Sequence, residues 1–407
     1  MRKRVIGVVL VTLMLLTLLF SLVKSYTGIF KTSDYLEDYD YLCDVIESEF
    51  VFLPLLEEEG IDYESIKESR RKQIESGELS LSEFYSCLNA MMSEDLQNQA
   101  HFSVLSPESY FYLVEFGEEE FPDGYKEILF DPKVKKAYTA LSGGNDLTQE
   151  DDATLGGSAP EKKDEIAHEV KAQYMEEYHM VIFHIPSFEA GVIQMDENTI
   201  VDELNRFSDK PIEHIVFDIT GNGGGLYSYW SQDIVKALGG EYSWNQRLYF
   251  RSSDYTNGQL VDGIYGVEKL NDTTEEITDS LKEIGIDSVI ENDVWLCSSE
   301  EKFASAKRWL LVDEGVYSSA DAFAAFCKNT GWATVVGRKT RGDGSAMRVM
   351  VELPNTGLVV EFSVMTTLNE KGEPNVLCGT YPDFLSKKEE PPLQTLYRII
   401  DIANKEE

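Results

Sequence analysis

Basic residues and histidines are scarce in this chain of 407 residues. Lysine and arginine total 36 against 73 aspartates and glutamates, which gives a formal net charge of -37. Negative charge of this size repels phosphate backbones and anionic lipid headgroups, so it argues against a nucleic-acid partner. Histidine is the side chain best suited to act as a base near neutral pH. The chain has five: His101, His168, His179, His184 and His214.

Cysteine is also rare, and the five cysteines include no closely spaced C-x-x-C pair. This spacing disfavours a zinc site, and an odd number cannot form a complete disulfide framework. Cys43 and Cys87 could pair if their helices pack together, which the sequence leaves open. We expect neither a metal nor a cofactor.

Long uncharged runs are absent except near the N-terminus, where Val5 to Val23 lies between Met1–Arg4 and Lys24. This length suits a membrane span, and the preceding basic residues keep the N-terminus cytoplasmic. A cleaved signal peptide is the alternative, although Ser21–Ser25 is a poor cleavage site. Residues 1–24 are therefore predicted to be a membrane anchor or signal peptide. In either case the rest of the chain is expected outside the cytoplasm, at the cell membrane or secreted.

The pattern of apolar residues divides the remaining chain into four parts. Apolar residues at helical spacing predict a helical domain over residues 33–104. Residues 105–178 are expected to be irregular and to contain a polar linker, from Gly143 to Asp164. Strands and helices alternate over residues 179–390, which predicts an α/β core. Residues 262–302 of this core read as an acidic, partly helical insertion, and residues 391–407 as a C-terminal helix and tail.

A buried strand, Trp309–Asp313, is followed closely by the start of a helix at Ser318 and Ser319. The first turn of a helix presents unpaired N–H groups and partial positive charge. Ser318 could be an ordinary helix cap. It could also be a nucleophile whose oxyanion is bound by the N–H groups that follow it.

A second strand-to-helix turn is unusually rich in glycine. The strand His214–Ile219 leads into Thr220–Gly225, which has four glycines within five residues. Glycine permits positive φ angles and lets backbone N–H groups gather around an anion. No Lys-Ser/Thr follows as in a Walker loop. A tight structural turn and an oxyanion-binding turn are both compatible with this pattern.

Four segments in order resemble motifs of the S41 family, which contains C-terminal processing and tricorn-like serine peptidases. Phe217–Gly225 resembles its D-L-R-x-N-x-G-G turn, and Ser318–Asp321 resembles its S-A-S-E nucleophile motif. Thr334–Gly342 and Gly379–Asp383 look like its V-V-G-x-x-T-x-G and G-x-x-P-D segments. The resemblance covers about residues 33 to 390. It implies a crotonase/ClpP-like α/β core with an N-terminal helical subdomain, and no PDZ domain is evident.

The two branches of the family take their base from different places. One uses a lysine in a G-K-G turn after the serine, but the turn here is Gly342-Asp343-Gly344, so that lysine is missing. The tricorn-like branch uses a histidine from an earlier D-x-H segment, and His101, which follows Asp95, matches it. The resemblance therefore implies Ser318 as nucleophile and His101 as base. The backbone N–H groups of Ser319, Gly223 and Gly224 would form the oxyanion hole.

A third catalytic residue is left unassigned. Tricorn-like members have a glutamate shortly before the G-x-x-P-D segment, and the matching position here is Val376. Glu370 and Glu373 lie nearby, and neither is chosen.

The implied function is an extracytoplasmic serine endopeptidase that acts on a peptide or protein. A catalytically inactive S41-like binding or scaffold protein is the alternative. A crotonase-like acyl-CoA enzyme is less compatible, because acyl-CoA is absent outside the cytoplasm and the chain is strongly acidic.

Overall fold

The computed structural model describes residues 30–115, 121, 123–143, 168–189, 191–261, 277–297, 301–345 and 347–406. The predicted anchor at residues 1–24 lies outside these ranges, as does the predicted polar linker from residue 144 to residue 164. Within the described ranges, none of the helices combines the length and the hydropathy that crossing a membrane requires.

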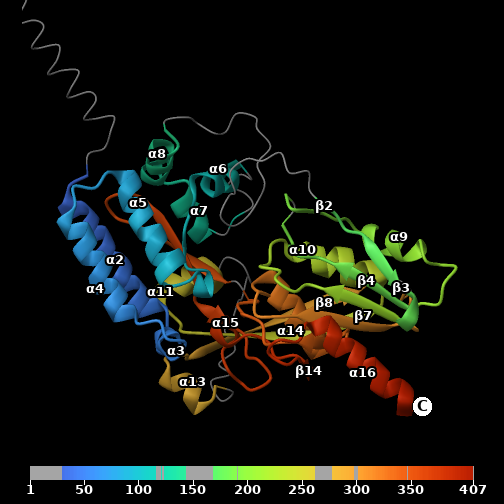
Figure 1. Cartoon of the computed structure of the whole chain (residues 1–407). Helices are drawn as coiled ribbons and strands as arrows, with labels where there is room; N and C mark the ends of the chain where they lie inside the picture. The colour runs from blue at the N-terminus through green and yellow to red at the C-terminus, as the bar shows by residue number, and fades with distance from the viewer. Residues whose placement is uncertain are drawn as a thin grey trace, which may run out of the picture.

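The N-terminal region is helical, as predicted. Its helices are α2 (Thr32–Glu49), α3 (Leu53–Glu58), α4 (Tyr63–Ser76) and α5 (Leu81–Ala90), which lie together on one side of the molecule (Figure 1). Local signals start two of them: the Asp62 carboxylate accepts the Ser65 N–H, and Ser80 forms a capping box with Glu83. Cys43 and Cys87 are both buried and both free thiols.

Residues 105–178 are expected to be irregular, but three stretches of their described part are helical. These are α6 (Pro107–Glu115), α7 (Asp123–Leu129) and α8 (Pro132–Leu141). Each helix has only seven to ten residues, so no helical period is visible in the sequence. Their buried side chains, which include Tyr110 and Tyr138, join the same core as α2 and α5. Packing therefore stabilises helices that the pattern did not predict.

A six-stranded sheet in the order β14-β10-β9-β6-β4-β3 forms the centre of the α/β part. Its strands are β3 (Ala172–Met175), β4 (Met180–His184), β6 (His214–Asp218), β9 (Lys307–Val312), β10 (Thr334–Gly337) and β14 (Phe384–Leu385). All neighbours run parallel except β3 and β4. Because β6 and β9 are parallel neighbours, the loops at their carboxyl ends emerge at the same edge of the sheet.

Helices cover both faces of this sheet, which explains why its central strands β4, β6 and β9 contain continuous apolar runs. On β9, Leu310 and Val312 pack towards Phe323 of α14 (Ser319–Thr330). The alternate residues Trp309 and Leu311 pack with Leu396 and Ile400 of α16 (Pro392–Glu406), the predicted C-terminal helix. The mixed α/β fold with a helical N-terminal region, predicted from the sequence, is thus confirmed.

The segment expected to be an acidic, partly helical insertion contains a long strand. Strand β8 (Ser288–Cys297) pairs antiparallel with β7 (Glu241–Phe250) along its whole length, and β13 (Met365–Thr366) completes this sheet. The strand was not predicted because the polar run Glu291–Asp293 interrupts its apolar residues, so its sequence shows no regular alternation. Only α13 (Asp279–Glu283) is helical among the described residues of this segment.

A third sheet, of order β1-β12-β11, connects the N-terminal helices to the C-terminal part of the chain. It contains β1 (Ser103–Val104), β12 (Val359–Ser363) and β11 (Arg348–Glu352). One hydrophobic core therefore holds residues from α2 to α8 together with residues of β11 and β12.

The remaining elements are η1 (Met91–Asp95), η2 (Gln99–His101), β2 (His168–Glu169), η4 (Glu176–Tyr178), β5 (Ile193–Gln194), α9 (Thr199–Asn205), α10 (Tyr227–Trp230), η5 (Ser231–Lys236), α11 (Asp254–Thr256), η6 (Asn257–Val261) and α15 (Asn375–Cys378).

Candidate active site

Ser318 stands at the turn between β9 and α14. Its backbone is at φ 54° and ψ -128°, and its side chain makes no capping hydrogen bond to the helix. Positive φ is uncommon for a residue with a side chain, and it is often associated with function. The Ser318 N–H donates to the Gly342 carbonyl at 2.9 Å, which fixes the turn. The structure therefore does not support the reading of Ser318 as an ordinary helix cap.

His101 meets Ser318 directly. Its Nε2 lies 2.8 Å from the Ser318 Oγ, and its side chain is 15% exposed. The pairing of β1 with β12 explains this approach, because Ser103 lies opposite Glu361. Continuing that antiparallel register by two residues brings His101 beside Ser363. A strand pairing thus carries the histidine to the nucleophile turn.

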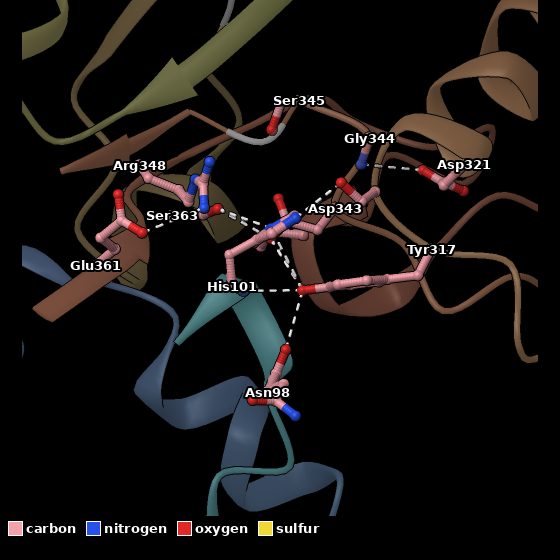
Figure 2. A network of polar contacts seen from close by, with 12 residues as sticks. Asn98, His101, Tyr317, Asp321, Asp343, Gly344, Ser345, Arg348, Glu361 and Ser363 are labelled. Atoms are coloured by element: carbon pink, nitrogen blue, oxygen red, sulfur yellow. Dashed lines mark hydrogen bonds and ion pairs between the residues drawn. The ribbon is translucent and has the colours of Figure 1, made fainter. Parts of the chain in front are cut away.

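Asp343 contacts the other side of the imidazole. Its Oδ2 lies 2.5 Å from His101 Nδ1, and its side chain is fully buried. The Ser363 hydroxyl donates to the same Oδ2 at 2.9 Å, as Figure 2 shows. Ser318, His101 and Asp343 therefore form a continuous chain of hydrogen-bonding groups.

Sequence reasoning missed this role of Asp343. The residue was noted only as the replacement for a lysine in the Gly342–Gly344 turn. The signal was present, since a carboxylate in that turn is suited to orient a histidine base where no lysine is available. The residues considered for a third member lie elsewhere: Glu373 accepts from Asn369, and Glu370 lies 3.9 Å from Lys328.

A buried carboxylate holds the turn that carries Asp343. Asp321 of α14 accepts the Thr340 hydroxyl at 2.5 Å and the Gly344 N–H at 3.2 Å. Burial raises the pKa of Asp321, and the Thr340 hydrogen bond opposes that rise. The Asp343 N–H donates to the Asn375 carbonyl at 3.1 Å. The turn is thus anchored on both sides of Asp343.

The Gly-rich turn packs against Ser318. Gly224 has φ +103°, and a Cβ added there would lie 2.9 Å from the Ser318 Cβ. The Gly224 N–H donates to Asn222 Oδ1 at 2.9 Å, so it is not available as the predicted oxyanion donor in this structure. Among the described residues, neither the Gly223 N–H nor the Ser319 N–H has a hydrogen-bond acceptor. Gly224 therefore lets the Gly-rich turn lie close to Ser318, and the N–H groups that stay unpaired are those of Gly223 and Ser319.

The remaining candidate histidines lie elsewhere or have other partners. His184 is exposed and lies 3.3 Å from Asp218, and buried His214 accepts from the Trp309 Nε1–H at 3.0 Å. Asp95, the first residue of the proposed D-x-H segment, pairs with Arg70 at 2.6 Å and does not contact His101. Of the five histidines, His101 is the one that contacts the Ser318 hydroxyl.

Comparisons with known proteins found distant similarities to solved structures. Among solved structures, a candidate peptidase from Parabacteroides merdae shares 16% identity with a TM-score of 0.51, over 91% of this chain and 97% of that chain. Mature CPAF complexed with lactacystin shares 13% identity, with a TM-score of 0.49 over 92% and 98% of the two chains. A lipoprotein from Streptococcus agalactiae shares 10%, with a TM-score of 0.41 over 90% and 96%. A search of the curated proteins found no match.

A family model identifies the chain more directly. The model of Peptidase family S41 matches residues 179–385, which is slightly more than half of the 407 residues. The match includes the Gly-rich turn, the Ser318 turn and the turn of Asp343, and it confirms the resemblance inferred from the four motifs. The chain belongs to peptidase family S41.

Proposed function

We propose that this protein is a serine endopeptidase in which Ser318 is the nucleophile, His101 the base and Asp343 the carboxylate that orients the base. Membership of the family supports a peptidase function. The finer assignment is supported by one observation above all. The His101 ring bridges Ser318 Oγ at 2.8 Å and Asp343 Oδ2 at 2.5 Å, each within hydrogen-bonding distance.

In the proposed reaction, His101 Nε2 removes the hydroxyl proton while the Ser318 Oγ bonds to the carbonyl carbon of the scissile peptide. The tetrahedral intermediate collapses, the C–N bond breaks, and the imidazolium gives its proton to the leaving amine. Water, deprotonated by His101, then attacks the acyl carbon. The bond from this carbon to Ser318 Oγ breaks, the imidazolium returns the proton to Oγ, and the acyl half of the substrate leaves as a carboxylic acid. The buried Asp343 carboxylate accepts the Nδ1–H, which keeps Nε2 free to act as the base.

The oxyanion would be bound by the N–H groups of Ser319 and Gly223. Ser319 is the first residue of α14, so its N–H adds to the partial positive charge of the helix start. Losing one donor of this kind typically lowers kcat by about 10²–10³. Gly224, whose N–H is already engaged, would serve by letting the turn approach Ser318.

Labelling with a fluorophosphonate tests this function against the alternative of an inactive binding or scaffold protein. The wild-type protein should be labelled on Ser318, and both Ser318→Ala and His101→Ala should lose the label. His184→Ala is the matched control. His184 also lies beside an aspartate, Asp218, but among the described residues it makes no hydrogen bond to Ser318. Absence of labelling in a folded wild-type protein would favour the scaffold. Cleavage of an internally quenched peptide with both ends blocked would test the endopeptidase assignment.

The extracytoplasmic location and the attachment through residues 1–24 are proposed on the sequence alone. The support is the uncharged run from Val5 to Val23 behind four residues that include three basic ones. A protein lacking residues 1–24 should be soluble and should retain labelling. If it still sediments with membranes, a single N-terminal attachment is wrong.

A further inference from the structure

The loop from Gln97 to His101 has a backbone conformation that its residue types rarely adopt. Gln97, Asn98, Ala100 and His101 have φ angles of 55°, 49°, 47° and 53°. Residues with a Cβ rarely adopt this left-handed conformation, and a run of them is maintained only where surrounding contacts determine it. Something outside the loop must therefore hold it, and the contacts point to one side chain.

Tyr317, which directly precedes Ser318, supplies those contacts. Its hydroxyl accepts the backbone N–H of His101 at 2.8 Å and lies 3.1 Å from the Asn98 carbonyl, to which it donates. Figure 2 shows this hydroxyl between His101 and Asn98. The same oxygen is 3.4 Å from Asp343 Oδ2. One phenol thus joins two residues of the strained loop to the segment that carries the nucleophile.

The ring of Tyr317 also packs on the base itself. Its centroid lies 4.8 Å from that of His101, with an angle of 26° between the planes. The guanidinium of Arg341 lies 4.6 Å from the same ring, and its Nη2 donates to the Gln97 carbonyl. Burial, together with the Asp343 carboxylate, raises the pKa of Tyr317 well above 10. The phenol therefore keeps its proton at neutral pH.

We propose that Tyr317 is a positioning residue that fixes the loop from Gln97 to His101 and so holds His101 within reach of Ser318. Arg341 supports it by holding the ring and the start of the loop. This inference rests on the proposed function, since it assigns the positioning of the proposed base. Tyr317 itself takes no part in proton transfer.

The decisive variant is Tyr317→Phe, which keeps the ring and removes only the hydroxyl. It should lower kcat and the rate of fluorophosphonate labelling about 10- to 100-fold, because displacement of a reacting group by about 1 Å has effects of this size. KM should change less than about twofold. Arg341→Gln should also lower kcat, but by a smaller factor, since it removes the cation from the Tyr317 ring and frees the Gln97 carbonyl while the Tyr317 hydroxyl still holds His101 and Asn98.

Tyr138→Phe is the matched control. The Tyr138 hydroxyl also accepts a backbone N–H, that of Val359 at 3.0 Å, but it lies in the helical core. It should lose stability without losing kcat per folded molecule. Unchanged labelling in Tyr317→Phe, or an equal loss of kcat in Tyr138→Phe, would overturn the positioning role.

A crystal structure of Tyr317→Phe separates this inference from the proposed function. We expect His101 Nε2 to lie beyond hydrogen-bonding distance of Ser318 Oγ, or the loop to leave its left-handed conformation. An unmoved His101 would overturn the inference even if the wild type is an active peptidase. Conversely, a displaced His101 would support it even if the wild type fails to label, a result that would count against the proposed function alone.

Discussion

His101 Nε2 lies 2.8 Å from Ser318 Oγ, although 217 positions separate the two residues in the sequence. Two local structures meet to create this contact. The β1–β12 pairing carries the histidine, and the turn between β9 and α14 carries the serine. The contact therefore depends on how the helical N-terminal region docks onto the α/β part.

Asp343→Asn should lower kcat about 10³- to 10⁴-fold, with little change in stability. The amide can present an N–H to His101 Nδ1, which favours the tautomer that leaves Nε2 protonated and unable to act as base. Peptide cleavage and fluorophosphonate labelling would measure the loss. Activity within tenfold of the wild type would exclude Asp343 as the orienting carboxylate.

Gly224→Ala should reduce labelling of Ser318 by at least about 100-fold. The added Cβ would lie 2.9 Å from both the Ser318 Cβ and the Tyr317 carbonyl oxygen, so the nucleophile turn would have to move. Gly372→Ala is the control, since Gly372 also has positive φ, at +77°, but has open space where the Cβ would stand. If both variants label equally well, close packing at Gly224 is not needed for activity.

Asp321→Asn should lower both stability and activity. An amide has a single acceptor oxygen, and its NH₂ group would face either the Thr340 hydroxyl or the Gly344 N–H. An unsatisfied buried group costs about 1–3 kcal/mol, and the turn of Asp343 should shift. Unfolding in urea and kcat per folded molecule would measure the two effects.

Asp38→Asn provides the comparison for that variant. Asp38 is buried and accepts two N–H groups and one hydroxyl from Asn355 and Thr356, in the turn after β11. The Asp38→Asn substitution should lower the free energy of unfolding without lowering kcat per folded molecule. An equal loss of kcat in both variants would mean that Asp321 acts only through general stability.

His214→Gln should make the free energy of unfolding less sensitive to acid. Burial, with a smaller contribution from Lys307, lowers the pKa of His214 below its usual 6.5. Below pH 6.5 the histidine of the unfolded chain is protonated, while that of the folded protein stays neutral. The free energy of unfolding therefore decreases as the pH is lowered, until the pH reaches the lowered pKa of the folded state. Urea unfolding between pH 8 and pH 4.5 should show the stability difference between wild type and variant shrinking towards acid. Parallel pH profiles would contradict a neutral, buried His214.

The two turns at the edge of the main sheet can be located from the order of the amino acids alone. Ser318 follows a short apolar strand and precedes an apolar helical period, and the Gly-rich turn follows another such strand. Neighbouring residues decide these features, so they are visible without a structure. The choice of His101 came from the family resemblance, and the structure brings it to Ser318.

The residues that complete the site around His101 come together through long-range packing. Asp343, Ser363 and Tyr317 meet around His101 because β12, the Gly342–Gly344 turn and the loop from Gln97 to His101 pack together. No periodicity marks such residues, since each contact joins parts of the chain far apart in sequence. The short helices α6 to α8 were missed for a related reason: their stability comes from the core that they share with distant elements, and local preference alone does not specify them.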